Sequence, residues 1–167
     1  MARAMATGRM SLSAIAPVDP RFGRIYLRSR MPKYRLDDVV VPKVVAFGIS
    51  CHVPDYRLCW SLNRALGLDL TRRRSDILEE NKGRKLHFPV FEQADEEGGL
   101  RWSLVCNTCG RSKLVPDHKA ADYYLLIDQE TALREERILE RVRAAEFVLT
   151  AFPVSLDELK SGHKLLL

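Results

Sequence analysis

The sequence predicts a single α+β domain. Its mainly antiparallel sheet has about five to six strands, with two main helices packed on one face and a short C-terminal helix. Short apolar runs of strand length are separated by hairpin-type turns. Two longer segments show the periodicity of amphipathic helices. The chain of 167 residues is 46% hydrophobic and 29% charged, which suits one domain with a core of its own.

The basic residues are unevenly distributed along the chain. Residues 1–30 contain six arginines and one acid, which leaves 21 of the 27 basic and 21 of the 22 acidic residues in the remainder. We interpret residues 1–32 as a basic leader, expected to be disordered, or as a mis-set start with translation beginning at Met31. Residues 33–167 then form the single α+β domain, whose neutral charge weakens a nucleic-acid function.

The sequence shows no sign of export or of membrane insertion. It has no apolar core of the length that a secretory signal needs, and no run of 18 apolar residues. We therefore expect a cytoplasmic protein with no membrane association, in which the cysteines are reduced thiols.

The first half of the domain contains one well-marked helix. Residues 34–41 are expected to form an extended edge segment, and residues 44–49 have the apolar character of a buried strand. A helix then begins at Pro54, which suits a first helical position, and ends at Gly67, which suits a C-terminal cap. The polar residues 69–85 indicate a solvated connection.

The second half of the domain is rich in strands. Apolar and polar residues alternate in Leu86–Glu92 and Leu100–Cys106, which predicts an antiparallel pair with one buried face, joined by a hairpin loop. A turn follows at residues 106–112. The remaining elements are a central strand at 123–127, a second helix at 129–145, a final strand at 147–154 and a short helix that begins near Ser155.

Cys106 and Cys109 lie in a Cys-x-x-Cys-Gly turn, the pattern in which two thiolates can share a zinc ion. Tetrahedral zinc needs two more ligands, and the candidates are Cys51 and Cys59, or His52 and His118. The spacing of the other two cysteines is unusual for zinc, and Cys59 is expected to be buried beside the first helix. We therefore favour a tight turn that contains two thiols, and we expect no cofactor.

Asp117 and Asp122 flank the loop before the central strand, with His118 between them. Paired carboxylates could perform acid–base chemistry. Polar loop residues more often accept hydrogen bonds from loose backbone N–H groups, and we favour that interpretation. No phosphate-binding glycine loop, metalloprotease helix or nucleophile elbow is present in the sequence.

The segment Val115-Pro116-Asp117-His118-Lys119-Ala120-Ala121-Asp122-Tyr123 resembles the signature of the IPExxxVDY family. Pro116, Asp122 and Tyr123 match it, and Val115 and Asp117 are conservative departures. The similarity extends over about residues 33–167. The family consists of short proteins from Bacteroidetes-type bacteria without an established activity. The resemblance therefore implies a compact cytoplasmic bacterial protein and no substrate.

These observations favour a non-enzymatic interaction or regulatory domain that binds a protein partner or itself. The candidate partner surface consists of Asp55, Tyr56, Arg57 and Trp60, with Val115 and Pro116 expected beside it. One alternative is an RNA- or ribosome-associated protein that uses Arg72–Arg74, Lys82–Lys85 and the basic leader. A second alternative is a small metal-binding domain at Cys106 and Cys109.

Overall fold

A six-stranded antiparallel sheet forms the centre of the domain in the computed structural model, which describes residues 43–81, 83–94 and 99–167. Its spatial order is β10 (Thr150–Val154), β1 (Val44–Ser50), β9 (Tyr123–Asp128), β6 (Leu100–Cys106), β5 (Val90–Ala94) and β2 (Thr71–Arg72). The α+β prediction is confirmed, and β9 lies inside the sheet between β1 and β6. The expected edge segment 34–41 and the leader lie outside the described residues.

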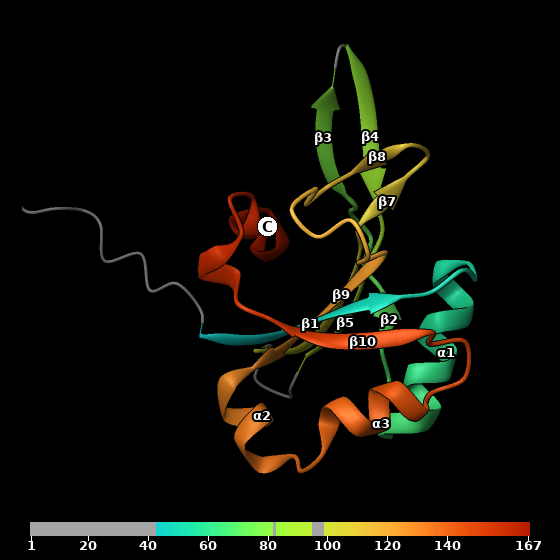
Figure 1. Cartoon of the computed structure of the whole chain (residues 1–167), viewed down its shortest axis with the longest axis vertical. Helices are drawn as coiled ribbons and strands as arrows, with labels where there is room; N and C mark the ends of the chain where they lie inside the picture. The colour runs from blue at the N-terminus through green and yellow to red at the C-terminus, as the bar shows by residue number, and fades with distance from the viewer. Residues whose placement is uncertain (1–42, 82, 95–98) are drawn as a thin grey trace, which may run out of the picture. The chain divides into compact units, whose positions relative to one another are not determined.

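Three helices cover one face of the sheet: α1 (Asp55–Leu66), α2 (Gln129–Arg134) and α3 (Ile138–Ala144) (Figure 1). Helix α1 packs through Leu58 and Leu62, both fully buried against this face. Pro54, predicted as the first helical residue, is the N-cap one residue before the helix, and Gly67 ends the helix as predicted, in the left-handed conformation with φ 71°.

The prediction of one continuous helix over residues 129–145 is wrong. The chain leaves helical geometry after Arg134 and resumes it at Ile138, with Arg137 in the left-handed region at φ 56°. Five residues separate Leu133 from Ile138, which in a straight helix would place them about 140° apart. The break lets Ile138 and Val142 reach the core while Leu133 stays 80% exposed.

The other face of the sheet is also buried, although the sequence predicted a single buried face. It is covered by the hairpin of β3 (Ile77–Asn81) and β4 (Arg84–Phe88), by the loop before β9, and by the 3-10 turns η1 (Leu156–Glu158) and η2 (Gly162–Leu166). In β6, Trp102 therefore packs on the helix side while Val105 packs on the opposite side.

Two further predictions, the single strand at 86–92 and the solvated connection at 69–85, are wrong. The run 86–92 is two strands, because Pro89 has no N–H for a ladder and ends β4 before β5 begins. The two strands join different sheets, since β4 pairs with β3 and β5 pairs with β6 and β2. The expected solvated connection at 69–85 thus contributes the strands β2 and β3 and the start of β4.

The turn expected at residues 106–112 is present as a small hairpin of β7 (Thr108–Cys109) and β8 (Ser112–Lys113), with Gly110 at φ 59°. Among the described residues, no helix is both long enough and apolar enough to cross a membrane.

Candidate functional site

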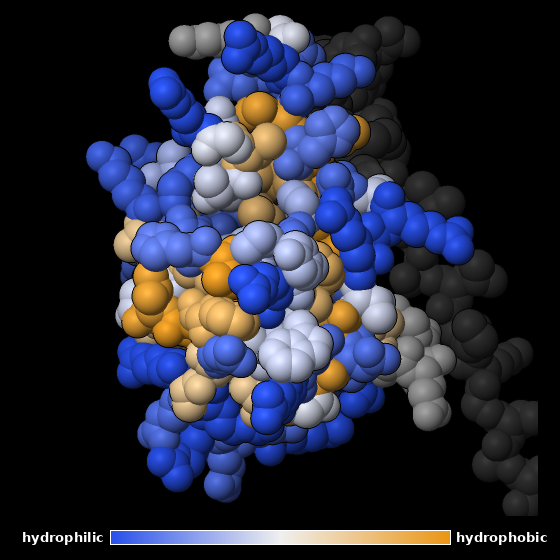
Figure 2. All heavy atoms as spheres, turned by 90° about the vertical axis from the view of Figure 1, so that its right-hand side faces the viewer, coloured by the Kyte–Doolittle hydropathy of each residue, from blue (hydrophilic) through white to orange (hydrophobic). Residues whose placement is uncertain are grey.

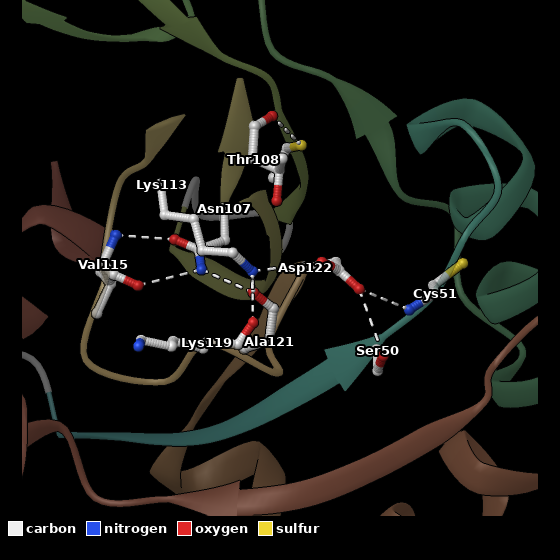
Figure 3. A network of polar contacts seen from close by, with 10 residues as sticks. Ser50, Cys51, Asn107, Thr108, Lys113, Val115, Lys119, Ala121 and Asp122 are labelled. Carbon is white, nitrogen blue, oxygen red and sulfur yellow. Dashed lines mark hydrogen bonds and ion pairs between the residues drawn. The ribbon is translucent and has the colours of Figure 1, made fainter. Parts of the chain in front are cut away.

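Asn107 organises the loop that carries the family-like signature, and it is fully buried between β6 and β7. Its side-chain amide donates to the carbonyl oxygens of Val115 (3.2 Å) and Ala121 (2.8 Å), and its Oδ1 accepts from the Val115 N–H (2.8 Å) (Figure 3). Its backbone N–H donates to the Asp122 carbonyl. One polar side chain thus satisfies backbone groups at both ends of the loop.

Asp122 joins this loop to the end of β1. Its Oδ2 accepts from the Cys51 N–H at 3.1 Å and from the Ser50 hydroxyl at 3.3 Å. Its Oδ1 lies 3.3 Å from Lys113 Nζ, which also donates to the Lys119 and Ala121 carbonyls (Figure 3). These contacts hold the Cys51 backbone, bind the Ser50 hydroxyl and balance the charge of Lys113, so the geometry gives Asp122 a structural role.

Asp117 has different partners. It is exposed, and its Oδ2 accepts from the Ser161 N–H at 3.4 Å, beside the C-terminal turns. The ring of His118 lies 5.7 Å from that of Phe152. The two carboxylates therefore serve separate segments, and the contacts of His118 and Asp117 do not form an acid–base pair with Asp122.

The remaining signature residues are divided between core and surface. Val115 is fully buried under the face of the sheet opposite α1, and Pro116 is exposed. Tyr123 is buried, and its hydroxyl donates to the Val53 carbonyl at 3.0 Å. The expectation that Val115 and Pro116 lie beside Tyr56 and Trp60 is wrong for Val115, because the sheet separates it from α1.

Cys51, Cys106 and Tyr123 line a shallow hollow of about 230 Å³ at the end of the sheet. Burial raises the pKa of both thiols, and the Cys106 Sγ donates to the Thr108 carbonyl at 3.3 Å. Tyr123 pairs with Ile49 on one side and with Cys106 on the other, so β9 lies between β1, which Cys51 directly follows, and the strand that carries Cys106. Both cysteines are free thiols.

The structure does not assemble a tetrahedral ligand set around Cys106 and Cys109. No group of three or more His, Cys, Asp or Glu side chains is arranged for a metal ion within residues 43–81, 83–94 and 99–167. Cys59 is buried against the helix side of the sheet, donates to the Leu70 carbonyl, and has a pKa that burial raises to about 11. It thus fills the core rather than completing a site at the turn.

The outer side of α1 presents two large aromatic side chains to solvent. Tyr56 is 64% exposed and Trp60 is 55% exposed. They are one helical turn apart, which places them next to each other on the helix surface. Figure 2 views this side of the molecule, where pale and orange side chains lie among blue charged ones.

Two arginines of α1 lie over aromatic rings, and one of these rings is that of Trp60. The Arg57 guanidinium lies 5.2 Å from the centre of the Phe147 ring, and that of Arg64 lies 5.8 Å from the Trp60 ring. Asp55, the acid of this surface, lies 3.5 Å from Arg72. We call Tyr56, Arg57, Trp60 and Arg64 the α1 surface. Sequence analysis missed Arg64, although its spacing of four residues from Trp60 could have revealed it.

The basic residues of the RNA hypothesis are largely engaged with acids or backbone. Arg72 contacts Asp76 at 2.8 Å, and Arg73 contacts Glu92 at 3.0 Å. On the β3–β4 hairpin, Lys85 is opposite Glu80 in the ladder. Arg74 and Arg84 are exposed, and Lys82 lies outside the described residues. The described part of this stretch thus carries both signs of charge and is not a uniformly basic surface.

Asn107 and Lys113 are the structural centres that the sequence analysis did not single out. The available signal was weak: a polar residue directly after an apolar strand, at the start of a turn. Such a residue is as typical of a solvated loop as of a buried side chain that holds a loop by hydrogen bonds. Which of the two it becomes depends on the segment that packs over it.

No family model matches the sequence, and no curated protein or solved structure matches the chain either. The resemblance to the IPExxxVDY family therefore stays a prediction.

Proposed function

We propose that this domain is a non-enzymatic protein-interaction module of the cytoplasm, and that its α1 surface binds an acidic segment of a partner protein. The observation that carries the proposal is the pair Tyr56 and Trp60, 64% and 55% exposed on a helix whose opposite face is fully buried. Large aromatic residues and arginines are the residue types that most often dominate binding energy at protein interfaces.

Helix α1 is held rigidly, so its aromatics are displayed in a fixed arrangement. The Ser61 hydroxyl donates to the Glu146 carbonyl at 2.6 Å, and the Asn63 side chain exchanges two hydrogen bonds with Leu70. At the C-terminal end, Arg141 Nη2 donates to the Leu66 carbonyl at 2.8 Å. A preorganised surface pays less ordering entropy on binding than a flexible one.

The charge of the α1 surface selects an acidic partner. Arg64 lies over Trp60 and Arg57 over Phe147, while the nearby Asp55 shares Arg72 with Asp76. A partner segment that combines Asp or Glu with an apolar side chain would match both features. Charge complementarity of this kind contributes mainly to partner choice and to the rate of association.

Strand addition is less well supported than binding on the helix. At the outer edge of β10, Pro153 has no N–H to offer, and Arg143 Nε donates to the Ala151 carbonyl at 2.8 Å. The edge strand at the other end of the sheet, β2, has only two residues. Both edges are poor templates for another chain.

The test is photo-crosslinking in the native host with p-benzoylphenylalanine at position 60. The matched control carries the same amino acid at Leu133, which is 80% exposed on α2. We expect a protein adduct from position 60 that is absent from position 133. The acidic segment of that protein, made as a peptide, should bind the purified wild-type domain, and Trp60→Ala and Arg64→Glu should each weaken binding at least tenfold.

Several outcomes would refute the proposal. A nuclease-sensitive adduct would favour the RNA hypothesis, and a product of twice the chain mass would show self-association instead. Equal crosslinking from both positions, or a peptide affinity that Leu133→Ala lowers as much as Trp60→Ala does, would show that the α1 surface is not specific.

A further inference from the structure

A second feature lies on the opposite face of the sheet from α1, beneath the C-terminal residues. There the strands and the C-terminal turn enclose a hollow of about 310 Å³. Its floor includes Val44, Val90 and Leu126 from three strands of the sheet, and Leu165 and Leu166 of η2 lie over it. Cores are packed so closely that gaps larger than a water molecule are few, and this volume is at the lower end of small-ligand sites.

The charged side chains around this hollow include Arg73, Glu92 and Asp128, and each of them already has a polar partner. Arg73 Nη1 lies 3.0 Å from Glu92 Oε1. The backbone N–H of Thr131 holds the pKa of Asp128 below its ordinary value, and the charge of Arg101 acts in the same direction. Because Arg73 and Glu92 already pair and Asp128 already accepts a hydrogen bond from Thr131, these groups offer a charged ligand little to offset its desolvation.

Two polar contacts hold the C-terminal turn over the hollow. Arg73 Nη1 donates to the carbonyl oxygen of Leu167 at 3.0 Å, and Lys164 Nζ lies 2.8 Å from Glu79 Oε2. The turn itself is a short 3-10 segment of five residues at the end of the chain. Both contacts are partly exposed and therefore weak, so the turn is held mainly by its packed leucines, of which Leu165 is 3% exposed.

We propose that this hollow, which we call the C-terminal hollow, binds an uncharged, mainly apolar small molecule, and that the turn Gly162–Leu166 closes over it. The apolar floor and leucine cover provide the binding energy. The Ser103 hydroxyl, which also lines the hollow, offers one polar contact that would orient the ligand. This inference is independent of the proposed protein interaction, because the two surfaces lie on opposite faces of the sheet.

A pair of fluorescent probes tests the charge and shape requirements together. N-phenyl-1-naphthylamine is neutral, and 1-anilinonaphthalene-8-sulfonate has the same rings with one negative charge. With the purified full chain, we expect saturable binding of one neutral probe per chain and at least tenfold weaker binding of the sulfonate. Ser103→Phe, which fills the hollow from its floor, should lower the affinity for the neutral probe at least tenfold.

Val44→Phe fills the hollow from another floor position, which is half-buried, and gives the same information if the Ser103 variant fails to fold. The double variant Arg73→Gln and Lys164→Gln should speed probe association, because it frees the turn. Trp60→Ala should leave probe binding unchanged. The proposal is overturned if the neutral probe does not saturate, if both probes bind equally, if Trp60→Ala removes binding, or if a folded filling variant binds as well as the wild type.

Discussion

Replacing Asn107 by alanine should destabilise the domain more than any other single polar-to-alanine change in the signature loop. The fully buried Asn107 side chain makes hydrogen bonds to Val115 N–H, Val115 C=O and Ala121 C=O. In Asn107→Ala, the Ala121 carbonyl keeps its bond from Lys113, whereas both backbone groups of the fully buried Val115 lose this partner.

The magnitude follows from those two groups. A buried donor or acceptor left without a partner costs about 1–3 kcal/mol. Two such groups predict a loss of about 2–5 kcal/mol in the free energy of unfolding, since partial entry of water reduces the sum. That loss is a large fraction of the roughly 5–15 kcal/mol that stabilises an ordinary domain.

Urea unfolding monitored by tryptophan fluorescence measures this loss, with Trp102 as a buried reporter on β6, the strand that Asn107 follows. Thr108→Val is the matched control, because the buried Thr108 Oγ1 has no hydrogen-bond partner among the described residues. We expect the control to change stability by less than about 1 kcal/mol or to raise it. A loss below about 1 kcal/mol for Asn107→Ala, or equal losses for both variants, would refute the idea that Asn107 stabilises the loop through its hydrogen bonds.

Three further predictions concern packing and titration. In Gly48→Ala, the new Cβ would lie 2.6 Å from the Phe152 ring, so unfolding should become about 1–3 kcal/mol easier, and Phe152→Leu should restore part of the loss in a thermal melt. An aromatic-disulfide reagent at pH 7 should modify one thiol quickly, that of the half-buried Cys109, and the three buried thiols only on unfolding; rapid reaction of two or more would contradict the burial. Burial raises the pKa of Tyr123, and burial with the charge of Asp117 raises that of Tyr124 to about 12. Since the folded state holds both protons more tightly, the two tyrosines should add a loss of stability that begins near pH 10, above the onset of the loss from the three thiols whose pKa burial also raises, and a flat urea midpoint between pH 10 and 12 would count against this.

Much of the fold could be predicted because its signals are local. The apolar runs at β1 and β9 have strand length, and Pro54 and Gly67 mark both ends of α1. The broken second helix and the divided strand at Pro89 were missed for a different reason. A helical or alternating pattern shows which side of a segment is apolar. It does not show whether the segment runs as one unbroken element or bends to follow the core.

The functional surfaces were predicted unevenly. Tyr56, Arg57 and Trp60 were proposed as surface residues from sequence, and α1 presents them to solvent. Val115 was assigned to the same surface and lies on the other side of the sheet, because strand order decides which segments meet. The C-terminal hollow could not be predicted, since its lining comes from strands and a turn far apart in the chain.

By itself, the sequence determined the α+β class, the central apolar strand, the limits of α1 and the concentration of excess positive charge before the domain. These are properties of composition and of neighbours within a few residues, which local sterics and solvation control. Only the tertiary structure decided that Asn107 and Asp122 hold a loop in place, and that the sheet is buried on both faces. Those outcomes depend on contacts between residues distant in sequence, and a buried polar group acquires its role only from the segment that folds over it.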